Sequence, residues 1–103
     1  MYARINPTID GYTFTSTEQL LVGYHGQRPG QKVNLSIIDS NTRKFFNGTG
    51  FQTQYVAITA DNLNNNRWSK SVKLPKGSYE CFARSFFENL YNKDPDSTKF
   101  TVK

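Results

Sequence analysis

Alternating apolar and polar residues recur along most of this chain, and the clearest run lies between residues 31 and 39. There Val33, Leu35 and Ile37 alternate with polar neighbours. A period of two places such residues on one face of an extended segment, so the pattern predicts a half-buried strand. A similar alternation in 97–102 predicts a closing strand.

The stretch 67–87 carries bulky side chains and predicts two strands joined by a turn. The first would bury residues of one parity, namely Trp68, Val72 and Leu74. The second would have one face made of Tyr79, Cys81, Ala83, Ser85 and Phe87. Pro75 has a fixed φ and no N–H, and Gly77 tolerates positive φ, so both suit a turn. We therefore expect an antiparallel hairpin here.

Shorter apolar runs predict the remaining strands. They lie at 8–14, with a bulge at Gly11, and at 19–24, 43–46 and 51–60, with the hairpin dipeptide Asn47-Gly48 before the last. The expected non-strand segments are a loose lead-in at 1–6 and polar loops at 61–66 and 88–96. About seven or eight strands, turns roughly every 8–12 residues and no helical period indicate an all-β antiparallel sandwich.

The length of 103 residues leaves room for one domain. We expect residues 1–103 to form it as a piece of a larger protein, because the chain stops inside a strand-like segment. One cysteine excludes an internal disulfide. No apolar run approaches the roughly 20 residues of a membrane helix, so we expect no membrane insertion.

The charge balance permits anionic partners but does not point to one. Thirteen Lys and Arg against eight Asp and Glu give a net charge of +5. These charges are spread singly, and the longest basic run is Arg43-Lys44, so an ordinary solvated surface is expected. A basic and aromatic patch of 43–46 with Arg84 and Phe86 matches no known motif, so nucleic acid is not an expected partner.

The residues suited to catalysis are too few for an enzyme. Cys81 falls on the apolar parity of its strand, which indicates a small buried side chain rather than a nucleophile. His25 stands in a glycine-rich loop, where we expect it to be solvated. One His and one Cys cannot assemble a transition-metal site. We expect no catalysis and no cofactor.

A calcium ion is the one metal that the sequence leaves open. The candidate oxygen ligands are Asp61, Asp94 and Asp96. The loop that starts at Asp61 has Leu63 in its third position, which breaks the alternate-ligand pattern of an EF-hand. Any site would therefore be of another type.

Several motifs together resemble a bacterial immunoglobulin-like (Ig-like) domain, as found in surface adhesins and secreted multidomain proteins. They are the Pro-Gly turn and alternating strand in 28–35, the segment 68–74, the Pro-Lys-Gly-Ser-Tyr corner in 75–79 and the closing 100–102. Tyr79, two residues before Cys81, matches the tyrosine-corner spacing of Ig folds. Unlike antibody domains, the chain lacks a partner cysteine.

The resemblance implies an Ig-like β-sandwich and a non-catalytic role. Such a module would act as a spacer or adhesion domain of a larger bacterial surface or secreted protein, outside the cell, with neighbouring domains as its partners. Its core would contain Val33, Leu35, Ile37, Trp68, Val72, Leu74, Tyr79 and Cys81.

The alternative is a module that binds carbohydrate or a host-surface protein through exposed aromatic residues. Both parities of the Tyr79 strand carry aromatic rings, which one core cannot easily absorb. The rings left for the surface are then drawn from Phe45, Phe46, Phe51, Phe82, Phe86 and Tyr91. The candidate ligand-binding residues are Phe45, Phe46, Arg84, Phe86 and Tyr91. Their gathering on one open surface would favour this alternative.

Overall fold

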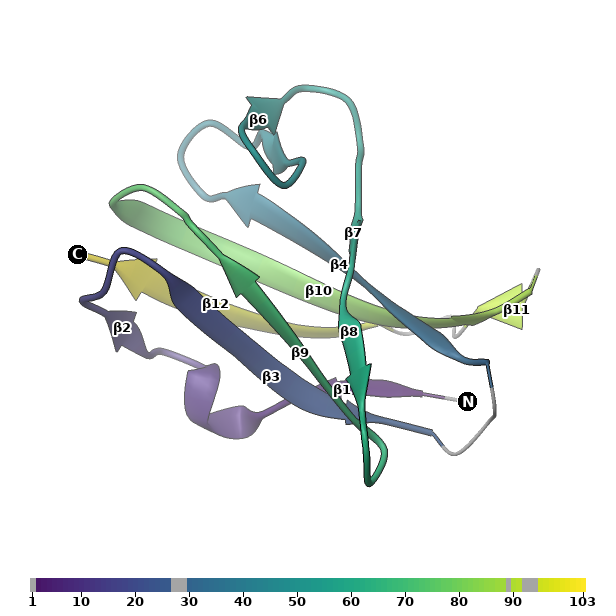
Figure 1. Cartoon of the computed structure of the whole chain (residues 1–103). Coiled ribbons are helices and arrows are strands. Elements are labelled where there is room, and N and C mark those ends of the chain that lie inside the picture. Colours follow the sequence, from purple (N-terminus) through teal and green to yellow (C-terminus); the bar gives the residue numbers. More distant parts are fainter. Residues whose placement is uncertain (1, 27–29, 89, 92–94) are drawn as a thin grey trace.

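Two β-sheets pack face to face in the computed structural model, which describes residues 2–26, 30–88, 90–91 and 95–103 (Figure 1). The smaller sheet contains, in spatial order, β1 (Ala3–Ile5), β3 (Gln19–His25), β9 (Arg67–Val72) and β8 (Asp61–Leu63). The larger contains β2 (Thr13–Phe14), β12 (Asp96–Val102), β10 (Gly77–Phe87), β4 (Lys32–Asp39), β5 (Phe45–Phe46) and β6 (Phe51–Gln52). Two further strands extend it, β7 (Ile58–Thr59) beside β4 and β11 (Leu90–Tyr91) beside β10.

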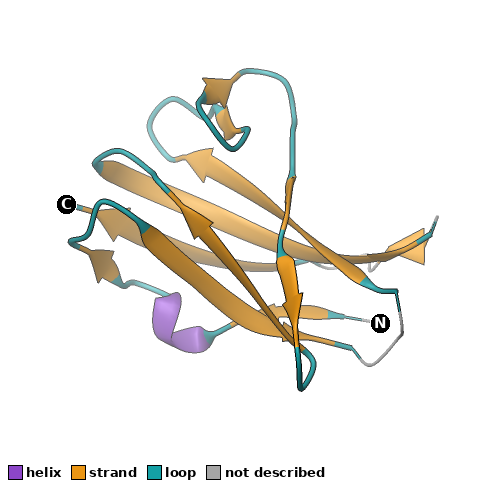
Figure 2. Cartoon of the chain, viewed as in Figure 1, coloured by secondary structure: helices purple, strands orange, loops and turns teal. Residues whose placement is uncertain are grey.

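Strands dominate the described residues, as Figure 2 shows. Their helical structure is a single 3-10 turn, η1 (Pro7–Ile9), between β1 and β2. None of the helical structure in the described part of the chain is long and apolar enough to cross a membrane.

The long strand β10 is the centre of the larger sheet, with β4 on one side and β12 on the other. Cys81 lies opposite both Ile37 of β4 and Thr98 of β12. The alternation predicted from sequence is confirmed in β4 and β10, because Val33, Leu35 and their partners face the smaller sheet and are buried. Apart from Ile38, which lies on the outward side of β4, the buried apolar residues form one cluster, made of Ala3, Ile5, Ile9, Leu21, Val33, Leu35, Ile37, Phe46, Ala60, Trp68, Val72, Leu74, Tyr79, Cys81, Ala83, Phe100 and Val102.

The hairpin predicted for residues 67–87 is wrong in its pairing. Strand β9 pairs with β3 and β8, whereas β10 pairs with β4 and β12 in the other sheet. The turn residues therefore carry the chain across the core. Two bonds hold this crossing: the Leu74 amide donates to Gln19 Oε1 at 2.8 Å, and Tyr79 Oη donates to the Pro75 carbonyl at 2.6 Å.

The N-terminal residues are not the loose lead-in that the sequence predicts. Residues 3–5 form β1, which pairs with β3, and Ala3 and Ile5 are buried. The predicted strand at 8–14 is also wrong in its first half, where η1 forms. Asn6 accepts a bond from the Thr8 amide, which starts this turn, and only β2 remains extended, parallel to β12.

Short edge strands explain why the structure has more strands than predicted. The 51–60 segment divides into β6 and β7, and part of the expected loop 61–66 forms β8 at the edge of the smaller sheet. Asn65 and Asn66 then adopt positive φ and turn the chain into β9. The hairpin at Asn47 is confirmed, since β5 pairs with β6.

Candidate functional site

The outer face of the larger sheet is the surface of β4, β5 and β10 that points away from the smaller sheet. On β10, Phe82, Arg84 and Phe86 alternate with the buried residues of that strand. Ser36 lies opposite Phe82, and Asn34 lies opposite Arg84. Aromatic and polar side chains are therefore interleaved along this face.

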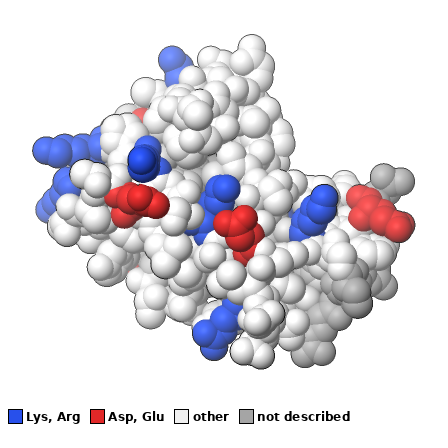
Figure 3. Space-filling view, viewed as in Figure 1, with Lys and Arg blue, Asp and Glu red and all other residues white. Residues whose placement is uncertain are grey.

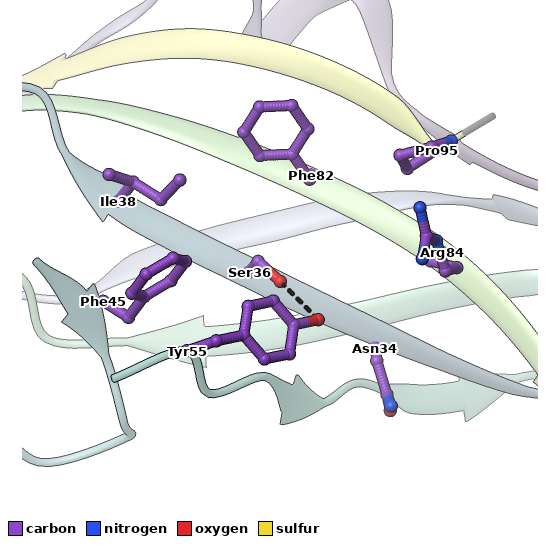
Figure 4. A pocket seen from close by; sticks show the side chains of 8 residues that line it. All are labelled: Asn34, Ser36, Ile38, Phe45, Tyr55, Phe82, Arg84 and Pro95. Carbon is purple, nitrogen blue, oxygen red and sulfur yellow. Dashed lines mark hydrogen bonds between the residues drawn. The ribbon is translucent and has the colours of Figure 1, made fainter. Parts of the chain in front are cut away.

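A half-open hollow of about 280 Å³ lies on this outer face (Figure 4). It is lined by Asn34, Ser36, Ile38, Phe45, Tyr55, Phe82, Arg84 and Pro95. Strands β4, β5 and β10 supply six of these residues, and segments beside them supply Tyr55 and Pro95. The hollow thus depends on residues far apart in sequence.

The polar groups of the hollow both donate and accept hydrogen bonds. Ser36 Oγ donates to Tyr55 Oη at 3.1 Å, which leaves the Tyr55 hydroxyl hydrogen for another acceptor. Asn34 Oδ1 accepts from Thr59 Oγ1 at 3.3 Å, and its amide nitrogen has no partner among the described residues. The Phe45 and Tyr55 rings pack edge to face, 5.3 Å between centroids, and form one wall.

A second aromatic group continues the outer face beyond the hollow. The Arg84 guanidinium lies 5.2 Å from the Tyr91 ring centroid, within cation–π range. The Phe86 and Tyr91 rings are 5.8 Å apart. Near the other end of the hollow, Arg43 Nη1 and Glu80 Oε1 form an ion pair at 2.9 Å.

Comparison with solved structures shows the fold. A fibronectin(III)-like module of CbhA from Clostridium thermocellum superposes with a TM-score of 0.55 at 10% identity, covering 98% of this chain and 95% of that one. The chain has an immunoglobulin-like fold. The Ig-like sandwich predicted from sequence is therefore confirmed.

Two Ig-domain structures give weaker superpositions. The RIG-5 IG1 homodimer has a TM-score of 0.49 at 8% identity, covering 100% of this chain and 97% of that one. Dpr11 IG1 bound to DIP-gamma IG+IG2 gives 0.42 at 13% identity, covering 100% of this chain and 47% of that one. No family model and no curated protein matches the sequence of this Ig-like chain.

The outer face of this Ig-like sandwich brings together four of the five predicted ligand-binding residues: Phe45, Arg84, Phe86 and Tyr91. Phe46 is not among them, and its predicted exposure is wrong. It is the residue of β5 that faces the core, where it is 2% exposed and packs against Phe51.

Sequence reasoning missed the part of the hollow that β4 and the segment around Tyr55 supply. Asn34, Ser36 and Ile38 belong to the outward parity of β4, and Tyr55 reaches them from between β6 and β7. One signal was visible in the sequence: Ile38 directly follows Ile37, so the alternation of β4 ends with an apolar residue on the outward side.

The predicted calcium ligands do not form one visible cluster. Asp61 lies in β8 of the smaller sheet, and Asp96 lies in β12 of the larger sheet. Asp96 Oδ2 accepts a bond from the Ile5 amide at 2.8 Å, which ties β12 to β1. Asp94 lies outside the described residues, so calcium binding stays a prediction.

The two potential nucleophile and base residues lie apart from the hollow. Cys81 is buried as predicted, and burial, with the negative charge of Asp96, raises its pKa to about 12. A thiol of this kind is unreactive near neutral pH. His25 is not solvated as predicted: it ends β3 and is 8% exposed, with Nδ1 2.7 Å from the Gly26 carbonyl oxygen.

Charge does not gather on the face that Figure 3 shows. Lys and Arg side chains are spread there among Asp and Glu side chains, as the sequence predicts. Arg84 is the one charged residue among the described residues that line the hollow.

Proposed function

We propose that this chain is a non-catalytic adhesion module of a larger bacterial surface or secreted protein. It holds a partner outside the cell with the outer face of its larger sheet. The observation that carries the proposal is the hollow lined by the half-buried rings of Phe45 and Phe82 and the exposed ring of Tyr55, because accessible rings around a concavity are typical of recognition surfaces.

Three features of the fold support a binding role over a catalytic one. Ig-like and fibronectin(III)-like folds are typically non-catalytic modules. The hollow contains no cysteine, histidine or carboxylate among its described residues. Cys81, the one thiol of the chain, faces the opposite side of β10 and is buried. The described residues of the hollow therefore offer contacts, and its hydroxyl groups have no histidine or carboxylate beside them to act as a general base.

A binding screen with matched surface variants tests the proposal. The chain is applied to immobilised cellulose, chitin, peptidoglycan, fibronectin and collagen, at low and physiological salt. A Phe45→Ala/Phe82→Ala double variant removes rings from the outer face of the larger sheet. A Leu20→Ala/Leu63→Ala variant is the control, because both leucines are exposed on the smaller sheet.

We expect at least one of these surfaces to retain the chain at physiological salt. Retention should be lost in the ring variant and kept in the leucine variant, with both variants still folded by circular dichroism. Equal loss in both variants, or no retention by any surface, would contradict the proposal.

A spacer role is the second candidate, and the placement of the chain ends favours it. Strand β1 begins at one end of the sandwich, where Ala3 pairs with His25, and β12 ends at the other, where Val102 pairs with Gly77 (Figure 1). Neighbouring domains joined at these two poles would extend in line. The outer face lies between the poles, so both roles are compatible.

A further inference from the structure

We propose that the hollow on the outer face binds a neutral pyranose ring of a carbohydrate, an inference that rests on the proposed adhesion function. The ring would lie against Phe45 and Phe82, and its hydroxyl groups would bond to Tyr55, Asn34 and Ser36. The eight residues that line the hollow surround one small concave volume, and Figure 4 shows them around it.

The position of the hollow excludes the commonest way in which a sheet binds a peptide. Strand addition needs an edge strand with free backbone groups. Here β10 is paired along both sides, with β4 and with β12, and β4 is itself flanked by β10, β5 and β7. A ligand of this hollow must therefore be held by side chains.

The side chains offer the contacts that a sugar ring needs. One face of a pyranose ring carries C–H groups, which pack on aromatic rings such as Phe45 and Phe82. Its edge carries hydroxyl groups that both donate and accept. The Tyr55 hydroxyl can donate, the Asn34 amide nitrogen can donate, and Ser36 Oγ can accept. A proline-rich peptide, the other ligand of aromatic grooves, offers mainly acceptors.

The size of the hollow and its mostly neutral lining favour a single neutral ring as the ligand. Its volume of about 280 Å³ lies at the lower limit of small-molecule pockets, roughly 300–1,000 Å³. Arg84 is the one charged residue among the described residues that line the hollow, and its guanidinium lies over the Tyr91 ring, 5.2 Å from the centroid. The other described residues of the lining are neutral. Binding by stacking and by neutral hydrogen bonds should resist salt, unlike binding of a polyanion to the net charge of +5.

Nuclear magnetic resonance titration of the ¹⁵N-labelled chain tests the inference. The probes are cellohexaose, chitohexaose and mannohexaose, each added to millimolar concentration, with heparin as the polyanion and a proline-rich peptide as the apolar competitor. We expect a neutral oligosaccharide to shift the amides of residues 34–38, 55 and 82–84. The indole N–H of Trp68 should stay in place, because it is buried and bonded to the Arg4 and Tyr24 carbonyls.

Two variants separate binding from folding. Tyr55→Phe removes one exposed hydroxyl and should weaken the affinity roughly two- to tenfold, the effect of one hydrogen bond. Phe82→Ala removes a stacking ring and should weaken it about tenfold or more. Leu20→Ala, on the other sheet, should change nothing. An unchanged Trp68 resonance shows that each variant is folded.

The outcomes also distinguish this inference from the proposed function. Affinity unchanged in both hollow variants, no shift with any neutral oligosaccharide, or binding of heparin or the peptide alone would overturn the pyranose inference. The adhesion proposal would survive that result if fibronectin or collagen retained the chain and the Phe45→Ala/Phe82→Ala variant lost that retention.

Discussion

Two buried ionisable residues of the core, Tyr79 and Cys81, couple the stability of this sandwich to alkaline pH. Burial, reinforced by Asp39, raises the pKa of Tyr79, and burial, reinforced by Asp96, raises that of Cys81 to about 12. Both groups are neutral when protonated, so the folded state holds its protons more tightly than the unfolded chain. The contribution of these two groups to the free energy of unfolding is fully present below their pKa values in the unfolded chain, near 9.0 for the thiol and 10.0 for the phenol.

The free energy of unfolding should therefore fall as pH rises above 9.0. The Cys81 share is lost between 9.0 and about 12, with a limiting slope of about 1.4 kcal/mol per pH unit. Urea unfolding at a series of alkaline pH values measures this decline in the free energy of unfolding. Cys81→Ala should be less stable near neutral pH but show a shallower decline above pH 9.0. An equal decline in both proteins would show that the thiol is not responsible.

The hydroxyl of Tyr79 holds the crossing between the two sheets. It donates to the Pro75 carbonyl at 2.6 Å, while the ring packs near Phe100. Tyr79→Phe keeps the ring and removes this bond, so we expect a loss of about 0.5–1.5 kcal/mol in unfolding free energy. Tyr12→Phe is the control, because that ring is 52% exposed, and it should change stability little. Equal stability of both variants would contradict a tyrosine corner here.

At the scale of elements, the sequence predicts the strands that carry a strong alternation of apolar and polar residues. It does not predict which strands pair with one another. The alternation in β4 and β10 identified which residues face the smaller sheet, because neighbouring residues of a strand point to opposite faces. The segment 73–76 turns the chain in either arrangement, so its sequence does not say whether β9 and β10 share a sheet. That choice depends on β3 and β8, which are distant in the chain. The short β1 has too few residues to show a period.

The candidate site was likewise predictable only as far as local strand patterns reach. The outward parity of β10 placed Arg84 and Phe86 on a surface, and the structure agrees. The hollow itself needs β4, β5 and the segment around Tyr55 to come together, which no local pattern encodes. The exposure of Phe46 was predicted wrongly because β5 contains only two residues, both phenylalanines. Such a strand has no alternation that tells which ring faces the core.

The contact of β1 with β3 and β9 depends on the absence of a side chain at Gly23. A Cβ atom there would overlap the Arg4 carbonyl oxygen and the Trp68 ring. Gly23→Ala should therefore lower the unfolding free energy by about 1–3 kcal/mol or more, as overpacking does. Gly50→Ala is the control, since nothing lies within 4 Å of its Cβ position. Thermal unfolding of both variants measures the difference, and similar melting temperatures would contradict this packing.

For the molecule as a whole, the placement of the two ends governs how copies can be joined. The sandwich is 36 Å long. Strand β1 begins at one of its poles, and β12 ends at the opposite pole (Figure 1). The hollow lies on the side of the sheet, between these poles. A partner bound there would not compete with a domain attached at either end. A module of this shape can therefore be repeated along a chain while each copy keeps its outer face open.

Two copies joined directly from Lys103 to Met1 should form an extended rod. Because the connection leaves one pole and enters the other, we expect a maximum dimension about twice the 36 Å of one copy. Small-angle X-ray scattering measures it. A version with a long glycine and serine linker is the control, and its distance distribution should be broader because such linkers behave as flexible coils. A directly joined pair as compact as a side-by-side dimer would contradict the spacer role without affecting the hollow, whose ligand binding can be measured on the same two-copy protein.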